Sequence, residues 1–460
     1  MLSNPTFLLL ITFGMGVVFH HVLSKRVRDF ITPWLLAYMF MVMLIGTTSG
    51  GVSHFFLTVF NFVIVMVLCD GCNVEGMRYN RACGAFLVFY GYIILACVLF
   101  GYYPYDSAIV CLRKLLDGFV VGYYLALWLC RTEGGLRKLL FAVMCSAAVT
   151  VLYSIVHGGF SSNFDESGRM ALDAATFDDD YNLNQNAMAA YMSCYMPFLV
   201  LALLQATRSF QERIVKLATI PIVMCVCLLM VRSGSRAAGV ALLPCIWYFM
   251  NSTRNRMVRG KRIAMMIVLC IAMAAGIVYT MRDAGSLRAF DFLNKNSSVG
   301  EGMERISTGR WGLYKRIIDE MTPMQKIFGR GLLSTSGKYN YETSEKYRSL
   351  SGNDHSGYVS IFARSGFVGL FLFAIFVVVF FLTARRCGDR GRLAIFLFMM
   401  WAVGCIGESW GMNGGRTAIL AGMGIGLVTR RRIINTELWD ANLHANSVMP
   451  YNPQYPVYVR

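Results

Sequence analysis

The feature that most constrains this chain is a succession of apolar stretches, each about as long as a lipid bilayer requires. A helix rises about 1.5 Å per residue, so roughly 20 apolar residues cross a hydrocarbon core about 30 Å thick. Only 15% of the 460 residues are charged and 56% are hydrophobic, which excludes an ordinary soluble protein, a disordered chain and a secreted disulfide scaffold. Because backbone polar groups within lipid must be satisfied inside helices, the sequence predicts an all-α polytopic integral membrane protein.

Thirteen stretches qualify as candidate transmembrane helices. They cover residues 6–23, 31–48, 53–69, 83–101, 115–130, 139–157, 187–206, 214–231, 235–251, 263–281, 357–383, 393–408 and 413–428. Since several are short, we expect 12 to 13 helices. The first stretch lacks the basic n-region and small-residue cleavage site of a signal peptide, so we expect it to stay in the chain.

The basic residues set the expected orientation. Alternate connections between the spans hold 23 Lys or Arg on one side and, apart from one long loop, only six on the other. The positive-inside rule places the first set, and the C-terminus with it, in the cytoplasm. Most of the net charge of +17 therefore reflects topology, and we expect no nucleic-acid partner.

The chain divides into four parts on this reading. Residues 1–281 hold the first ten helices and an acidic outer loop at 158–186, and residues 357–429 hold the remaining helices. Between them, residues 282–356 form a partly helical, outward-facing loop, and residues 430–460 form a cytoplasmic tail. A loop of this length in a compact protein usually carries function, so the catalytic part is expected at 282–356.

Two arginines at the outer membrane boundary are candidate anion ligands. Arg232 and Arg236 flank a Ser-Gly-Ser turn so short that both lie at the mouth of two helices. The planar guanidinium group matches phosphate oxygens, and two of them suit a lipid-linked diphosphate. The alternative is a pair of interfacial arginines whose charged ends reach lipid headgroups.

The long loop contains a predicted helix at 309–321, which we expect Thr322-Pro323 to stop. Arg310 lies in its first turn, where a cation opposes the helix dipole and is compensated by an anion; the alternative is a solvated surface arginine. The following segment, 328–331, reads Phe-Gly-Arg-Gly and predicts a flexible turn that lets backbone approach a ligand closely.

His355 is the candidate general base. It ends the long loop at membrane level, where a lipid-linked substrate presents its head group. Histidine is the usual base near neutral pH, and Asp354 is placed to orient it. The alternative is a structural histidine.

The acidic loop offers weaker candidates. The carboxylates of Asp178–Asp180 either hold a divalent cation or form a solvated acidic run. Asn184 belongs to a cluster of amides that can hydrogen-bond sugar hydroxyls. The chain has no phosphate-binding loop, dinucleotide fingerprint or nucleophile elbow. Cys69 and Cys72 form a lone C-x-x-C without the two further ligands that a zinc site needs, so we expect no cofactor and no metal.

Four segments, in order, resemble the O-antigen ligase and O-antigen polymerase superfamily of bacterial envelope glycan enzymes. They are Asn182 to Pro197, Ser235-Arg236 with its apolar helix, Gly309-Arg310-Trp311 through Gly331, and His355 with Gly366 and Gly369. The resemblance covers roughly residues 180–385. The chain departs from the family pattern at Ser356, where asparagine is usual, and at Ala237, where glycine is common.

The resemblance implies glycosyl transfer at the outer face of the bacterial inner membrane, in lipopolysaccharide or other polysaccharide biosynthesis. The donor is an undecaprenyl-type, polyprenyl-diphosphate-linked glycan, and the acceptor is either a lipid A core sugar or a second lipid-linked glycan. Arg236 and Arg310 are expected to bind the diphosphate, and His355 to act as base. Arg232 and Arg364 are further candidates. The loop is then periplasmic, and the partners are membrane lipids and lipid-linked substrates.

A transporter or flippase of lipid-linked glycans is the alternative from another class. Such proteins usually show internal repeats and charged residues near the centres of spans. This chain shows no repeat, and its ionisable residues concentrate at the outer boundary. The sequence therefore favours the enzyme and leaves both ligase and polymerase open.

Overall fold

The computed structural model describes about half of the chain, and every regular element in that part is a helix. The described residues are 36, 80–101, 108, 111–112, 115–131, 134–156, 185–204, 210–232, 236–251, 260, 310–331, 356–407 and 418–429. The helices are α5 (Arg81–Phe100), the π-helix η1 (Leu116–Val120), α7 (Val121–Arg131), α8 (Gly135–Val156), α9 (Gln185–Leu204), α10 (Phe210–Arg232), α11 (Arg236–Asn251), α14 (Arg310–Asp319), α15 (Pro323–Phe328), α17 (Gly357–Arg385), α18 (Gly388–Gly407) and α19 (Ile419–Leu427).

These helices confirm the predicted fold class. Three of them, α5, α8 and α17, are long and apolar enough to cross a membrane, and α9 and α10 contain shorter apolar helical stretches. Apart from α14 and α15, which lie in the predicted long loop, the described helices fall on the predicted spans, although α8, α10 and α18 begin earlier than expected and α19 begins later. The predicted spans 6–23, 53–69 and 263–281 lie outside the described residues, so the total of 12 to 13 helices stays a prediction.

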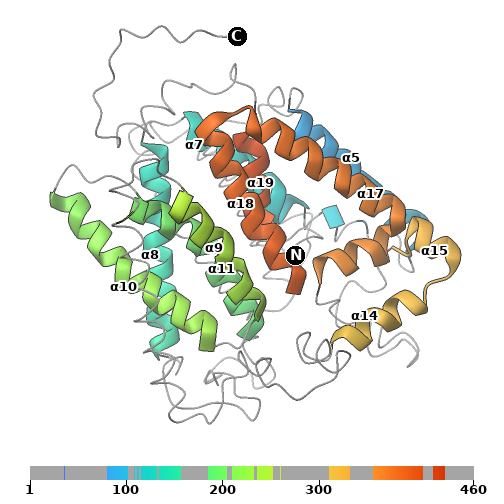
Figure 1. Ribbon diagram of the computed structural model, residues 1–460, viewed down its shortest axis with the longest axis horizontal. Coiled ribbons are helices and arrows are strands. Elements are labelled where there is room, and N and C mark those ends of the chain that lie inside the picture. Colours follow the sequence, from blue (N-terminus) through green and yellow to red (C-terminus); the bar gives the residue numbers. More distant parts are fainter. Residues whose placement is uncertain are drawn as a thin grey trace, which may run out of the picture.

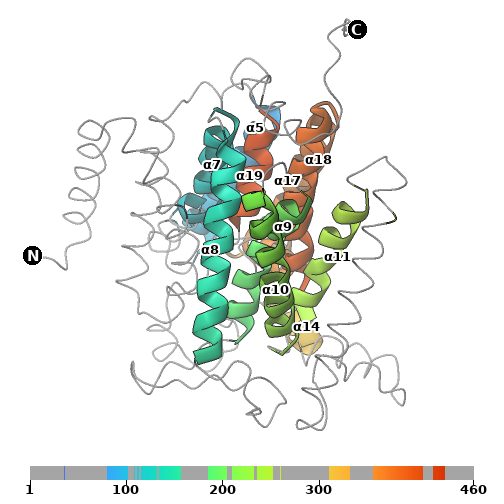
Figure 2. The same cartoon turned by 90° about the vertical axis from the view of Figure 1, so that its left-hand side faces the viewer.

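The helices form two adjoining groups that run roughly alongside one another (Figures 1 and 2). In one group α17 packs on α5 and α18, and α19 packs on α7 and α18. In the other group α9 packs on α8, α10 and α11. The two groups meet where α18 contacts α11 and α9.

Aromatic rings fill the centre of the first group. Phe86 of α5 lies 4.3 Å from Phe119 of η1 and 5.3 Å from Phe376 of α17, centroid to centroid. Trp401 of α18 continues the cluster, 5.5 Å from both Phe119 and Phe398. Such ring pairs add about 0.5–1.5 kcal/mol each beyond the area they bury, so the cluster fixes how α5, α17 and α18 pack.

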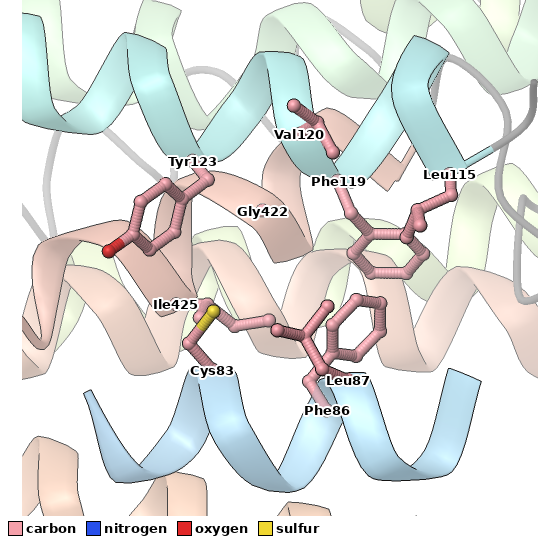
Figure 3. Close-up of a pocket in the computed structure, with 9 residues that line it drawn as sticks. All are labelled: Cys83, Phe86, Leu87, Leu115, Phe119, Val120, Tyr123, Gly422 and Ile425. Carbon is pink, nitrogen blue, oxygen red and sulfur yellow. The ribbon is translucent and has the colours of Figure 1, made fainter. Parts of the chain in front are cut away.

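A small pocket beside this cluster opens between α5, η1, α7 and α19 (Figure 3). Its lining is apolar apart from the Tyr123 hydroxyl and the Cys83 thiol. A charged glycan donor needs cationic or hydrogen-bonding groups, so this pocket is not the candidate site.

The helix ends form two sets that agree with the predicted alternation of connections. At one end, the Asn80 side chain caps α5 and donates to the carbonyl of Ile425, 2.7 Å away, and to the Thr429 hydroxyl, 3.2 Å away. At the other end, the last turn of α5 lies against residues 328–331, which also contact the first turns of α17. The predicted topology places the first set in the cytoplasm and the second outside.

Candidate functional site

A break in α17 organises the end of the bundle that we expect to face outward. Gly366 has φ 60° and ψ −160°, so α17 consists of two helical stretches that meet at an angle beside α15 (Figure 1). Just before the break, the carbonyl oxygens of Ala363 and Arg364 accept hydrogen bonds from the backbone N–H groups of Arg330 and Gly331, at 3.0 and 3.1 Å. The long loop thus supplies donors to carbonyls at the end of the first stretch.

Three glycines allow the backbones of the loop and of α17 to approach closely enough for these hydrogen bonds. Gly329, Gly331 and Gly366 all have positive φ, at 90°, 68° and 60°. A Cβ atom on Gly331 would lie 2.7 Å from the Cα atom of Gly101, and one on Gly366 would lie 2.6 Å from the Gly329 nitrogen. The sequence predicted a flexible turn that approaches a ligand, whereas in the structure the turn approaches α17 and α5, because helix backbone fills that space.

The structure also corrects the role expected of Thr322-Pro323. The pair begins a second helix, α15, and α14 already ends at Asp319. Thr322 and Gln325 form a reciprocal capping box, and proline at the first helical position needs no hydrogen-bond donor. Phe328, the last residue of α15, accepts a hydrogen bond from Tyr92 of α5 through its carbonyl oxygen, at 3.1 Å. The capping chemistry therefore turns an expected stop into a second anchor for the loop.

The predicted diphosphate ligands lie at helix termini. Arg232 is the last residue of α10, Arg236 is the first of α11 and Arg310 is the first of α14. Figure 2 shows α14 at the lower end of the bundle, and Figure 1 shows that it lies on the side of α15 and α17, away from α10. Arg232 is only 2% exposed, which disfavours an arginine that extends to lipid headgroups.

The positions of these arginines differ in their relation to the helix dipole. Arg232 at a C-terminus is stabilised by the dipole, whereas Arg236 and Arg310 at N-termini are opposed by it. A helix N-terminus also presents backbone N–H groups without helical partners, and these favour anions. A guanidinium group added to such an N-terminus makes a strong local preference for a phosphate oxygen.

The predicted base lies just outside the described residues, as do Asp354, Asn184 and Asp178–Asp180. Its neighbour Ser356 is described: it is buried, has extended backbone and occupies the N-cap position of α17. Residue 355 therefore leads directly into the first stretch of α17. Ser360 and Arg364 follow Ser356 at intervals of four, which places them on the same side of this stretch.

Arg330 is a candidate that the sequence interpretation did not select. It is only 5% exposed, and its backbone pairs with Ala363 beside the break in α17. A buried arginine at a membrane boundary is costly unless it is paired or functional. In the sequence, Arg330 is marked only by its position between Gly329 and Gly331.

No group of three or more His, Cys, Asp or Glu that could hold a metal ion occurs among the described residues. The fold defines an all-helical polytopic membrane protein in which Arg232, Arg236 and Arg310 lie at helix termini.

Residues 217–374 match the O-antigen ligase family. The matched segment includes Arg232, Arg236, Arg310 and His355, and it extends through the break in α17. The match covers about a third of the chain and supports the resemblance to the O-antigen ligase and polymerase superfamily; it indicates glycosyl transfer of the O-antigen ligase type in general. No curated protein matches the chain significantly.

Proposed function

We propose that this protein transfers a glycan from a polyprenyl diphosphate to an acceptor sugar hydroxyl at the outer face of the bacterial inner membrane. The observation that carries the proposal is the placement of Arg232, Arg236 and Arg310 at three helix termini within the segment that matches the O-antigen ligase family. A lipid-linked diphosphate has the charge and the location that these groups recognise.

The proposed reaction needs charge neutralisation and one proton transfer. The bond between the anomeric carbon and the diphosphate oxygen breaks, and a bond from that carbon to the acceptor oxygen forms. Arg236 and Arg310 stabilise the charge that develops on the departing diphosphate, with Arg232 beside them. His355, oriented by Asp354, takes the proton from the acceptor hydroxyl.

Arg330 and Arg364 are further cationic candidates in the proposed reaction. Their backbones meet where the loop pairs with α17, and Arg364 lies two turns beyond Ser356 on the same side of the helix. In the proposed reaction, arginines take the charge-neutralising role that a divalent metal has in many diphosphate-dependent enzymes.

Replacing the base provides the test. In membranes supplied with a radiolabelled lipid-linked donor, His355→Ala should lower the transfer rate by about 10²–10⁴-fold, because general-base assistance is lost, while donor binding persists. His444→Ala, in the predicted tail, is the matched control and should transfer normally. Robust transfer by the His355 variant would refute the assignment of the base.

The lipid-linked glycan that accumulates in a deletion strain distinguishes a ligase from a polymerase, and both from a flippase. Long lipid-linked polymer left untransferred indicates a ligase, and a single unassembled repeat unit indicates a polymerase. Donor that accumulates on the cytoplasmic leaflet indicates a flippase and would overturn the proposal.

A further inference from the structure

Two cysteine sulfurs meet at the end of the bundle that carries the candidate site. The Sγ atoms of Cys97 and Cys111 lie 3.7 Å apart, and both side chains are fully buried. Cys97 lies in the last turn of α5, and Cys111 precedes η1 in the chain. The Tyr90 hydroxyl donates to the Cys111 carbonyl oxygen at 2.9 Å, so the segment around Cys111 is held against α5 by a second interaction.

This contact differs from the other sulfur contacts of the described residues. Cys227 and Cys245 each lie against a methionine sulfur, and Cys387 lies against carbonyl oxygens. A disulfide requires sulfurs about 2.0 Å apart, so the Sγ atoms of Cys97 and Cys111, at 3.7 Å, must approach each other for the bond to form. Among these sulfur contacts of the described residues, the contact between Cys97 and Cys111 joins two thiols.

The position along α5 gives the redox environment. Cys97 lies one turn before Gly101, against which Gly331 of the long loop packs. Under the predicted topology this end of α5 faces the extracytoplasmic side, where disulfides form and persist. The inference thus rests on the topology, and it adds to the proposed function without depending on the transfer reaction.

We propose that Cys97 and Cys111 form a disulfide in the mature protein. The co-reactant is an oxidant of the cell envelope that carries a disulfide and oxidises thiols. One cysteine thiolate attacks the oxidant's disulfide and forms a mixed disulfide; the second thiolate then attacks that bond and releases the oxidant as a dithiol. Two thiols of the chain are oxidised, and the oxidant gains both electrons and both protons. The exchange precedes packing, because both sulfurs are buried in the folded chain.

The disulfide would tie the outer end of α5 to the segment that leads into η1. Ala96 of α5 and the C-cap residue Gly101 form the surface on which Gly331 rests, and Gly331 in turn pairs with α17. A covalent link at Cys97 therefore fixes the support of the loop that carries Arg330.

Thiol counting on the full-length protein tests the proposal. Membranes from an expression host with an intact envelope thiol-oxidising pathway are quenched in acid, denatured and labelled with maleimide-polyethylene glycol, with and without prior reduction. The chain has 14 cysteines, and we expect two fewer adducts without reduction than with it. Mass spectrometry of the unreduced wild type should find the two peptides linked.

Variants fix the identity of the pair. Cys97→Ser should abolish the difference between the two labelling conditions, whereas the control Cys83→Ser, also buried in α5, should keep a difference of two. Equal labelling of the wild type under both conditions, or a difference that persists in Cys97→Ser, would overturn the proposal. Transfer activity measured on the same membranes tests the proposed function separately.

Discussion

The break in α17 at Gly366 leads to a quantitative prediction. Gly366→Ala adds a Cβ atom at φ 60° and ψ −160°, a conformation nearly confined to glycine. That Cβ would lie 2.5 Å from the carbonyl carbon of Ile327 and 2.6 Å from the Gly329 nitrogen. Both are backbone atoms, so α15 and α17 must separate to accommodate the methyl group.

Two energetic costs add in Gly366→Ala, one from the backbone conformation and one from overpacking. The backbone conformation costs about 1–3 kcal/mol for a residue with a side chain, and overpacking of a close contact costs about 1–3 kcal/mol more. We therefore expect a destabilisation of about 2–6 kcal/mol. Transfer activity should fall as well, because the segment containing Arg330 loses its contact with α17.

Alanine substitutions at two other glycines serve as controls that distinguish the conformational cost from the overpacking cost. Gly388 also has positive φ, at 59°, but a Cβ there meets nothing within 4 Å, so Gly388→Ala should carry the conformational cost alone. Gly91 lies in the interior of α5 with open space around it, and Gly91→Ala should be neutral or stabilise by up to about 1 kcal/mol.

Thermal unfolding in detergent, followed with a thiol-reactive dye, provides the assay, because unfolding exposes the buried cysteines. The expected order of apparent Tm is Gly91→Ala highest, then Gly388→Ala, then Gly366→Ala. If Gly366→Ala is as stable as Gly388→Ala, the close contact between the loop and α17 contributes nothing and the reasoning is wrong.

Three further predictions concern the two ends of the bundle. Asn80→Ala should destabilise by about 2–4 kcal/mol in the same assay, because it removes the cap of α5 and the hydrogen bonds to Ile425 and Thr429, whereas Asn80→Asp keeps the cap and should lose less. Arg330→Ala should lower transfer by about 10²-fold through loss of a cation beside the diphosphate, while Arg392→Ala, an exposed arginine paired with Asp389, should leave the rate unchanged. Chelation of divalent metals should not change the transfer rate, and a large loss that magnesium restores would contradict the proposed use of arginines.

The sequence located the outer arginines but not the contact between residues 329–331 and α17. Arg232, Arg236 and Arg310 stand out because the positive-inside rule does not require them. Arg330 does not stand out in the sequence, because a charged residue in a glycine-rich turn belongs to no periodic pattern that would indicate burial. The break at Gly366 was also hidden, since an apolar stretch containing a glycine reads as one continuous span.

The sequence by itself determined that this is a helical membrane protein, where most of its helices lie and in which direction they are expected to run. The physical reason is that hydropathy and the placement of basic residues are properties of local composition, which the bilayer reads directly. Only the tertiary structure decided that the loop pairs with a broken helix, that Arg330 is buried and that Cys97 meets Cys111. Each of these contacts joins segments whose neighbours in space are set by packing between helices, and no local pattern encodes that packing.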